Sequence, residues 1–258
     1  MEPKIIGVLF LLLLFAFLGQ VAPFAPGETG DVVKVEDQSR IFSPGQGPAS
    51  GEGASPRDGV QAPDGSRSPA ARPGKTGGRI AGHLIVIDPG HGGTDTGAVA
   101  PSGLYEKDVN LAVSLLLVRM LQEAGAAVIL TREDDRDVSL AERVEIANRS
   151  VADLFVSVHS DSHTDPAKSG FTVYYGSGEG MTLARAVHNQ MRRQLTIGDL
   201  GVRSADFYVL NNTWIPAILV EVAFLSNPTE AQLLANPAFQ KRAAAAISRG
   251  IEDYLRRR

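Results

Sequence analysis

The feature that most constrains this chain is an alternation of two patterns from His83 to Arg258. Short apolar runs of strand length are separated by longer stretches of helical character. We expect strands at residues 84–87, 127–130, 154–158, 172–175, 207–210 and 218–222, and helices at residues 107–124, 140–148, 181–195 and 237–255. This alternation predicts an α/β fold, a single domain with a mostly parallel or mixed twisted sheet of about six strands and helices on both faces.

Local signals at the helix ends support these boundaries. Ser139 and Glu142 have the spacing of a capping box at the start of the second helix, and Gly125 ends the first helix. Sheets of this class bind ligands outside the carboxyl ends of their strands. Functional side chains are therefore expected at residues that directly follow the predicted strands.

The chain divides into three parts by composition. Residues 1–25 contain an uncharged apolar run from Ile5 to Leu18 and are predicted to be a signal peptide or an N-terminal membrane anchor. The run is shorter than the roughly 20 residues that span a bilayer, yet no clear cleavage site follows it, so both alternatives remain open. Residues 26–82 hold 12 Gly and 7 Pro and are predicted to be a disordered linker, whereas residues 83–258 form the folded domain.

Charge and composition exclude several classes of partner. The whole chain has a formal net charge of −4, and residues 83–258 contain 17 Lys and Arg against 21 Asp and Glu. Acidic domains bind polyanions poorly, so we expect no nucleic-acid partner and contact with a membrane only through the N-terminal segment. Because the chain has no cysteine, any metal ion must be bound by His, Asp or Glu side chains. The sequence gives no indication of oligomeric state.

Two histidines stand at the predicted carboxyl ends of strands. His91 follows the first strand in a glycine-rich loop, and His159 ends the apolar run that starts at Leu154. Both positions suit a metal ligand, although His91 taken alone also fits a surface-loop histidine. Three neighbouring side chains are weaker candidates because they lie in a turn segment: Asp161, His163 and Asp165.

Two glutamates complete the candidate set. Glu221 interrupts an apolar run that otherwise predicts a central strand, and burying a carboxylate without a partner is costly. It suits a general base beside a metal ion, and an ion pair with Arg203 is the alternative. Glu106 precedes a helix that begins near Lys107, where the helix dipole alone favours an acidic residue, so its surroundings leave its role open.

Together these side chains suggest a catalytic metal site. We hypothesise that His91, Glu106 and His159 bind one zinc ion, which leaves a fourth position for water. Zinc would polarise a scissile carbonyl and lower the pKa of the water, while Glu221 takes the proton of the water and passes it to the leaving amine.

Five ordered motifs carry a resemblance to a known family. They start at Ile87 (Ile-Asp-Pro-Gly-His-Gly-Gly), Glu106 (Glu-Lys-Asp-Val-Asn-Leu), Thr131 (Thr-Arg-Glu), Ser157 (Ser-Val-His-Ser) and Val220 (Val-Glu-Val-Ala-Phe-Leu-Ser-Asn). With this set, residues 84–257 resemble the zinc-dependent N-acetylmuramoyl-L-alanine amidases, the amidase type 3 catalytic domains of bacterial cell-wall remodelling. The resemblance implies that His91, Glu106 and His159 hold the zinc ion and that Glu221 is the catalytic carboxylate.

The resemblance also implies the substrate and the location. The substrate is expected to be peptidoglycan, cleaved at the amide bond between N-acetylmuramic acid and L-alanine, by an enzyme exported to the cell envelope. Arg203 resembles a residue beside the cleft and would bind carboxylates of the stem peptide, with a plain surface arginine as the alternative. The interval from His159 to Glu221 is short, which predicts a site that is open without an activator.

Two other activities fit the same motifs. One is a zinc peptidase or deacetylase on the same scaffold, which keeps the metal ion but yields different products. The other is a peptidoglycan-binding protein without catalysis, which the presence of all three candidate ligands and Glu221 disfavours.

Overall fold

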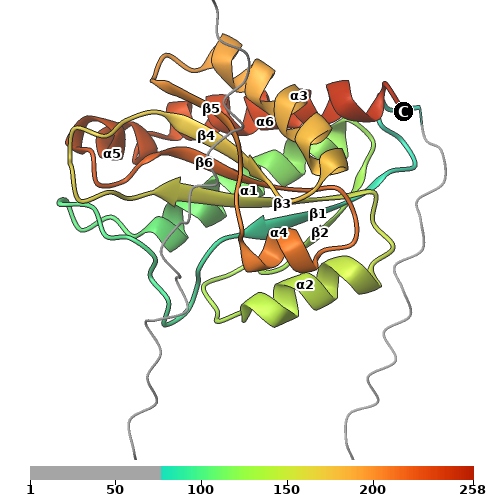
Figure 1. Cartoon of the computed structure of the whole chain (residues 1–258), viewed down its shortest axis with the longest axis horizontal. Helices are drawn as coiled ribbons and strands as arrows, with labels where there is room; N and C mark the ends of the chain where they lie inside the picture. Colours follow the sequence, from blue (N-terminus) through green and yellow to red (C-terminus); the bar gives the residue numbers. More distant parts are fainter. Residues whose placement is uncertain (1–76) are drawn as a thin grey trace, which may run out of the picture. The chain divides into compact units, whose positions relative to one another are not determined.

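The computed structural model describes residues 77–258, which form one mixed sheet of six strands in the order β2-β1-β3-β6-β4-β5 (Figure 1). The strands are β1 (Leu84–Pro89), β2 (Ala127–Leu130), β3 (Leu154–Asp161), β4 (Phe171–Tyr175), β5 (Asp199–Ser204) and β6 (Ala217–Phe224). All neighbouring pairs are parallel except β4 and β6, which are antiparallel. The α/β class and the six-stranded mixed sheet are confirmed.

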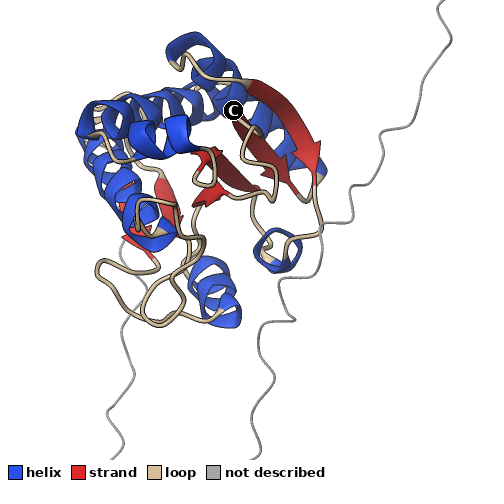
Figure 2. Ribbon diagram, turned by 90° about the vertical axis from the view of Figure 1, so that its left-hand side faces the viewer, coloured by secondary structure: helices blue, strands red, loops and turns tan. Residues whose placement is uncertain are grey.

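Helices cover both faces of this sheet (Figures 1 and 2). They are α1 (Glu106–Glu123), α2 (Leu140–Arg149), α3 (Gly178–Gln194), α4 (Tyr208–Asn212), α5 (Pro228–Leu234) and α6 (Pro237–Leu255). Successive side chains of a strand point to opposite faces, so Ile85 belongs to the core that includes residues of α1, α3 and α6, whereas Val86 belongs to the core that includes residues of α2 and α4. The two sheet faces therefore carry separate hydrophobic cores.

One strand and one helix are placed differently from the sequence expectation. Residues 207–210, predicted to be a strand, form the N-cap and the first turn of α4, where Val209 and Leu210 are buried, Phe207 is partly buried against the core and Tyr208 is exposed. The strand that was not predicted is β5, at the edge of the sheet. Its ends are exposed, so its sequence has no alternating apolar pattern. Helix α5 was also not predicted. It is a short helix capped by the side chain of Asn227, which accepts hydrogen bonds from two backbone amides.

The helix caps agree with the sequence signals. The hydroxyl of Ser139 accepts a hydrogen bond from the amide of Glu142 at 3.2 Å, and Gly125 follows α1 with a φ of 99°. A side chain at that φ is strained, so glycine is suited to the end of this helix.

Residues 77–82 belong to the folded unit, although the sequence places them in the linker. Ile80 is buried in the core under α1, and its amide donates to the carbonyl of Ala124 at 3.0 Å. The guanidinium of Arg79 donates two hydrogen bonds to the carboxylate of Glu252 on α6. The predicted signal or anchor and the rest of the predicted linker lie outside the described residues. Within residues 77–258, no helix combines the length and apolar character needed to cross a bilayer.

Candidate metal centre and active site

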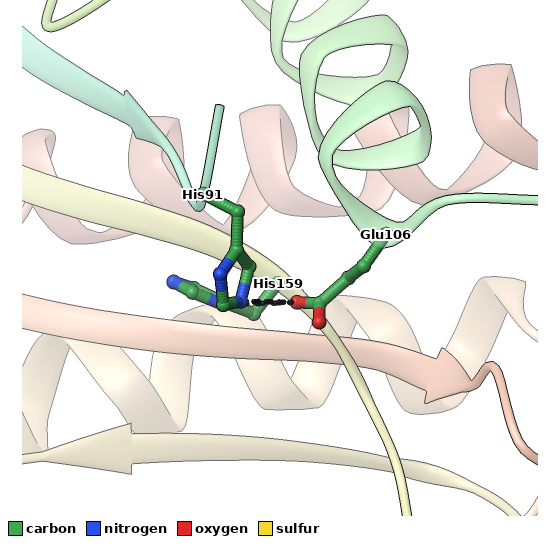
Figure 3. Close-up of side chains that lie close together, drawn as sticks. All are labelled: His91, Glu106 and His159. Atoms are coloured by element: carbon green, nitrogen blue, oxygen red, sulfur yellow. Dashed lines mark hydrogen bonds and ion pairs between the residues drawn. The ribbon is translucent and has the colours of Figure 1, made fainter. Parts of the chain in front are cut away.

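Three side chains from separate segments meet at the carboxyl ends of β1 and β3. His91 follows β1, Glu106 is the first residue of α1, and His159 lies on β3. Oε1 of Glu106 lies 3.2 Å from Nε2 of His91 and 3.0 Å from Nδ1 of His159 (Figure 3). Each residue offers one ligand atom, and these atoms all lie within 4.8 Å of one another. The structure thus brings together the three side chains that the sequence singled out.

The carboxylate of Glu106 is held by several donors. Its Oε1 accepts from the side-chain amide of Asn110 at 3.1 Å and from the backbone amide of Ser160 at 3.2 Å, and its Oε2 accepts from the amide of Ala98 at 2.9 Å. Burial alone would raise the pKa of Glu106, but hydrogen bonds and charges from the two histidines outweigh it and hold the pKa well below its usual value. Glu106 is therefore an ionised carboxylate held in a fixed position, which suits an oxygen ligand of a metal ion.

His91 is oriented from its other ring nitrogen. Its Nδ1 lies 2.8 Å from Oδ2 of Asp95, so a carboxylate fixes the ring and directs Nε2 toward Glu106. Burial alone would lower the pKa of His91, but the hydrogen bonds to Asp95 and Glu106 raise it to about 9. The role of Asp95 was not predicted from the sequence.

Two glycines leave the space that this cluster occupies. A Cβ at Gly90 would collide with the ring of His159, and a Cβ at Gly97 would collide with Glu106 and His91. Gly97 also has a φ of 62°, which a side chain adopts only with strain. The glycines at positions 90 and 97 therefore allow the side chains of His91, Glu106 and His159 to pack closely.

Two buried arginines hold the loop that carries His91. Arg132 donates from Nε to the carbonyl of Pro89 at 3.0 Å and from one terminal nitrogen to the carbonyl of Gly90 at 2.9 Å. Arg143 donates to the carbonyls of Pro89 at 2.7 Å and His91 at 2.8 Å. Sequence reasoning missed both residues, because nothing in their spacing signals that a guanidinium is buried among carbonyls.

Glu221 lies on β6 directly opposite His159 on β3. Its Oε2 is buried and has no hydrogen-bond partner. Burial raises the pKa of Glu221 well above its usual value, and the negative charges of Asp161 and Glu106 raise it further. The carboxyl group of Glu221 thus lies beside the His and Glu cluster and lines the same cleft.

The suggested ion pair between Glu221 and Arg203 is absent from the described structure. Arg203 is exposed on β5, and its Nε donates to the carbonyl of Leu200 at 3.1 Å. Of the three weaker candidates, His163 and Asp165 are exposed and contact each other, and neither joins the metal-binding group.

A cleft of about 870 Å³ opens onto the cluster. Its lining includes His91, His159 and Glu221, together with residues of the α2 and α4 segments. Arg203 is not among the lining residues. The predicted site borders an open cleft, in agreement with the expectation that its short intervening segment leaves it uncovered.

The donor set fits a divalent metal ion in a catalytic role. Two imidazoles and one carboxylate form a site of nitrogen and oxygen ligands that faces a cleft, and such sites keep a position free for water or substrate. Glu221, whose Oε2 is buried without a hydrogen-bond partner, lines the same cleft as the two histidines. Fold and site together define the class of protein, a metal-dependent hydrolase built on a mixed α/β sheet.

Comparison with known proteins identifies the family. Residues 85–253 match the N-acetylmuramoyl-L-alanine amidase family, and the chain belongs to it. It is 38% identical over 193 residues to the germination-specific N-acetylmuramoyl-L-alanine amidase of Bacillus subtilis, covering 68% of this chain and 81% of that protein.

Solved structures give the same result. The amidase AmiC2 of Nostoc punctiforme is 42% identical with a TM-score of 0.66, and the alignment covers 67% of this chain and 97% of that one. The catalytic domain of CwlV from Bacillus (Paenibacillus) polymyxa is 38% identical with a TM-score of 0.66, and 67% and 98% of the two chains are covered.

The activity follows from the family. The protein is a peptidoglycan hydrolase that cleaves the amide bond between N-acetylmuramic acid and the L-alanine of the stem peptide. This result agrees with the predicted amidase and not with the alternatives of a peptidase, a deacetylase or a binding protein without catalysis.

Proposed function

We propose that the amidase works with a single zinc ion held by His91, Glu106 and His159, and with Glu221 as the proton-transferring group. The observation that carries this proposal is the buried, unpartnered Oε2 of Glu221 opposite His159 in a cleft. A zinc ion bound by this ligand set would supply Lewis acidity toward the amide carbonyl and the attacking water.

Other residues of the chain orient these side chains, and Glu221 transfers the proton. Asp95 keeps the ring of His91 oriented, and the donors around Glu106, among them the amide of Ala98, keep that carboxylate in place. Glu221 removes a proton from the attacking water and delivers it to the nitrogen of L-alanine as the C–N bond breaks. The lactyl group of the sugar leaves as a carboxylic acid, and the stem peptide leaves with a free amino terminus.

The raised pKa of Glu221 suits both halves of this transfer. Burial, together with the charges of Asp161 and Glu106, makes its carboxylate a stronger base than an exposed glutamate. The same shift lets the protonated form persist until the leaving nitrogen accepts the proton.

The decisive experiment is digestion of purified peptidoglycan by residues 77–258, with and without a chelator, alongside Glu221→Gln. Mass spectrometry of the products should show stem peptides that begin with a free L-alanine, and both chelation and Glu221→Gln should abolish them. Metal analysis of the purified protein should find about one zinc per chain, the number that a single three-ligand site holds. Products cut within the stem peptide, or full activity of Glu221→Gln, would contradict the assignment.

Two further expectations belong to this proposal. Arg203 is proposed to bind a carboxylate of the stem peptide, because it is an exposed cation on β5, which pairs with β4, the neighbour of the strand that carries Glu221. Residues 1–25 are proposed to export the enzyme to the cell envelope, where its substrate lies. Removing residues 1–25 should leave the enzyme in the cytoplasmic fraction.

A further inference from the structure

Helices α3 and α6 pack closely on one face of the sheet. Gln190 of α3 donates a hydrogen bond to Asp253 of α6 at 2.6 Å, and a Cβ at Gly250 would collide with the backbone of Val187. Both helices contribute to the core on the face opposite α2 and α4 (Figure 1). Their outward sides thus form one surface, which faces away from the helices that wall the catalytic cleft.

This surface is strongly positive, although the net charge of the whole chain is −4. Residues 178–194 and 237–258 contain nine basic and three acidic residues, a net charge of +6. The other described residues contain nine basic and 18 acidic residues, a net charge of −9. The nine basic side chains, here called the basic face, are all exposed: Arg185, Arg192, Arg193, Lys241, Arg242, Arg249, Arg256, Arg257 and Arg258.

Few acidic groups neutralise the basic face. Arg256 pairs with Asp253 at 2.6 Å, and Arg258 pairs with Glu179 at 2.9 Å. The third acidic residue, Glu252, is already paired with Arg79. Within residues 77–258, the seven other members of the basic face form no salt bridge, although Arg192 interacts electrostatically with Asp199 and Arg257 with Asp253, so most of their charge is available to a partner.

The chain enters the folded unit beside this face. Arg79, two residues after the first described residue, is bound to Glu252 near the end of α6. The segment that precedes residue 77 includes the uncharged run of residues 5–18, the part of the sequence predicted to contact a bilayer. The linker therefore joins the domain next to its most positive surface.

We propose that the basic face docks on the anionic phospholipid surface of the membrane. Each basic residue close to such a surface adds roughly fivefold to affinity, so several unpaired arginines give a substantial second attachment beside the N-terminal segment. Because the cleft extends between α2 and α4, this docking leaves the active site open toward the wall. The inference rests on the proposed export. It replaces the expectation, drawn from average charge, that only the N-terminal segment contacts the membrane.

Vesicle binding tests this proposal. The solved relatives consist almost entirely of the matching unit, with 97% and 98% of their chains covered, so residues 77–258 are a suitable fragment. Binding is measured by co-sedimentation with vesicles of phosphatidylcholine alone and of equal parts phosphatidylcholine and phosphatidylglycerol. The fragment should bind only the anionic vesicles, and high salt should release it. The triple variant Arg185→Gln, Arg193→Gln, Arg249→Gln should bind roughly a hundredfold more weakly.

The matched control removes the same charge elsewhere. The triple variant Arg136→Gln, Arg149→Gln, Lys168→Gln alters three exposed residues outside the basic face and should keep its vesicle binding. Equal loss in both triple variants, or no preference for anionic vesicles, would overturn the proposal. So would a basic-face variant that loses binding to lipid-free cell walls but not to vesicles, because the partner would then be a wall polymer.

The test is independent of catalysis. The basic-face variant should digest soluble peptidoglycan fragments as the wild type does, because its three substitutions lie outside the cleft. Glu221→Gln, in turn, should bind anionic vesicles normally. These two variants therefore distinguish a failure of the docking proposal from a failure of the catalytic proposal.

Discussion

The carboxylate of Asp95 contacts the ring nitrogen of His91 that faces away from Glu106. Replacing it in Asp95→Ala removes the group that orients this ligand, and partners of this kind typically contribute 10- to 100-fold to metal affinity. We therefore expect zinc affinity, measured by competition with a chelator, to fall by roughly that factor. Thermal stability should change little, because the side chain of Asp95 is 64% exposed.

Asp134→Ala is the control for this variant. Asp134 is also an exposed loop aspartate, with a side chain 74% exposed, and it contacts Arg136 rather than a histidine. Unchanged zinc affinity in Asp95→Ala, or an equal decrease in both variants, would show that Asp95 does not orient the ligand.

Arg203 tests the predicted recognition of the stem peptide. Arg203→Ala should raise KM for peptidoglycan fragments with a free stem carboxylate about tenfold while kcat stays the same, because an exposed charge-assisted hydrogen bond contributes to binding and not to the reaction. Fragments with an amidated stem should not distinguish the variant from the wild type. A fall in kcat with unchanged KM would instead place Arg203 in the catalytic step.

At the scale of single residues, the clustering of three side chains was predictable and their surroundings were not. His91 follows β1 and His159 lies near the end of β3, and the carboxyl ends of parallel neighbours meet, so topology brings the two histidines together. Glu106 was assigned by hypothesis and resemblance, since a helix terminus by itself explains an acidic residue. The space provided by Gly90 depends on an atomic contact with a ring 69 positions away, which spacing along the chain does not encode.

Between elements, Arg132 ties the His91 loop to the helix that begins with Glu106. Besides Pro89 and Gly90, its guanidinium donates to the carbonyl of Lys107 on α1 at 2.8 Å and to that of Asp134 at 3.0 Å. Arg132→Lys keeps the charge but lacks the planar fork, so several buried carbonyls lose their donors. We expect the free energy of unfolding in urea to fall by about 3 kcal/mol.

Arg136→Lys is the comparison for this loss. Arg136 also donates to a backbone carbonyl, that of Thr131 at 3.1 Å, but its side chain is 56% exposed and water replaces the bond. Its unfolding free energy should stay within about 0.5 kcal/mol of wild type. If Arg132→Lys is no less stable than Arg136→Lys, the buried guanidinium does not connect the loop to α1.

The strand predicted at residues 207–210 was wrong for a physical reason. Residues 207–210 are apolar enough to suggest a strand, but only one side of this segment meets the core, and a single helical turn satisfies that requirement. β5 has the reverse character, because an edge strand beside β4 gains its backbone hydrogen bonds from one neighbour and needs little apolar surface. Central strands such as β3, buried on both faces, were recognised because their apolar runs are continuous.

Across the whole molecule, a buried acid connects the sheet to α2. Asp88 on β1 accepts hydrogen bonds from Thr131 at 2.6 Å and Ser157 at 2.7 Å, and from Arg143 of α2 at 2.6 Å. Burial alone would raise the pKa of Asp88, but the charge of Arg143 and the three hydrogen bonds lower it below its usual value. The ionised form is thus part of the native state.

The lowered pKa of Asp88 determines the direction in which the stability of the fold changes with pH. Because the pKa of Asp88 is lower in the folded chain than in the unfolded one, its contribution to stability is complete above about pH 4 and is lost as the pH falls through the lower folded value. Asp88→Asn leaves Arg143 buried without its counter-charge and should cost about 3 to 5 kcal/mol at neutral pH. Measured by urea unfolding, the difference between wild type and variant should shrink steadily below about pH 4, whereas Glu133→Gln, an exposed control, should match the wild type throughout. A difference that stays constant with pH would mean that the ionised state of Asp88 does not contribute to folding.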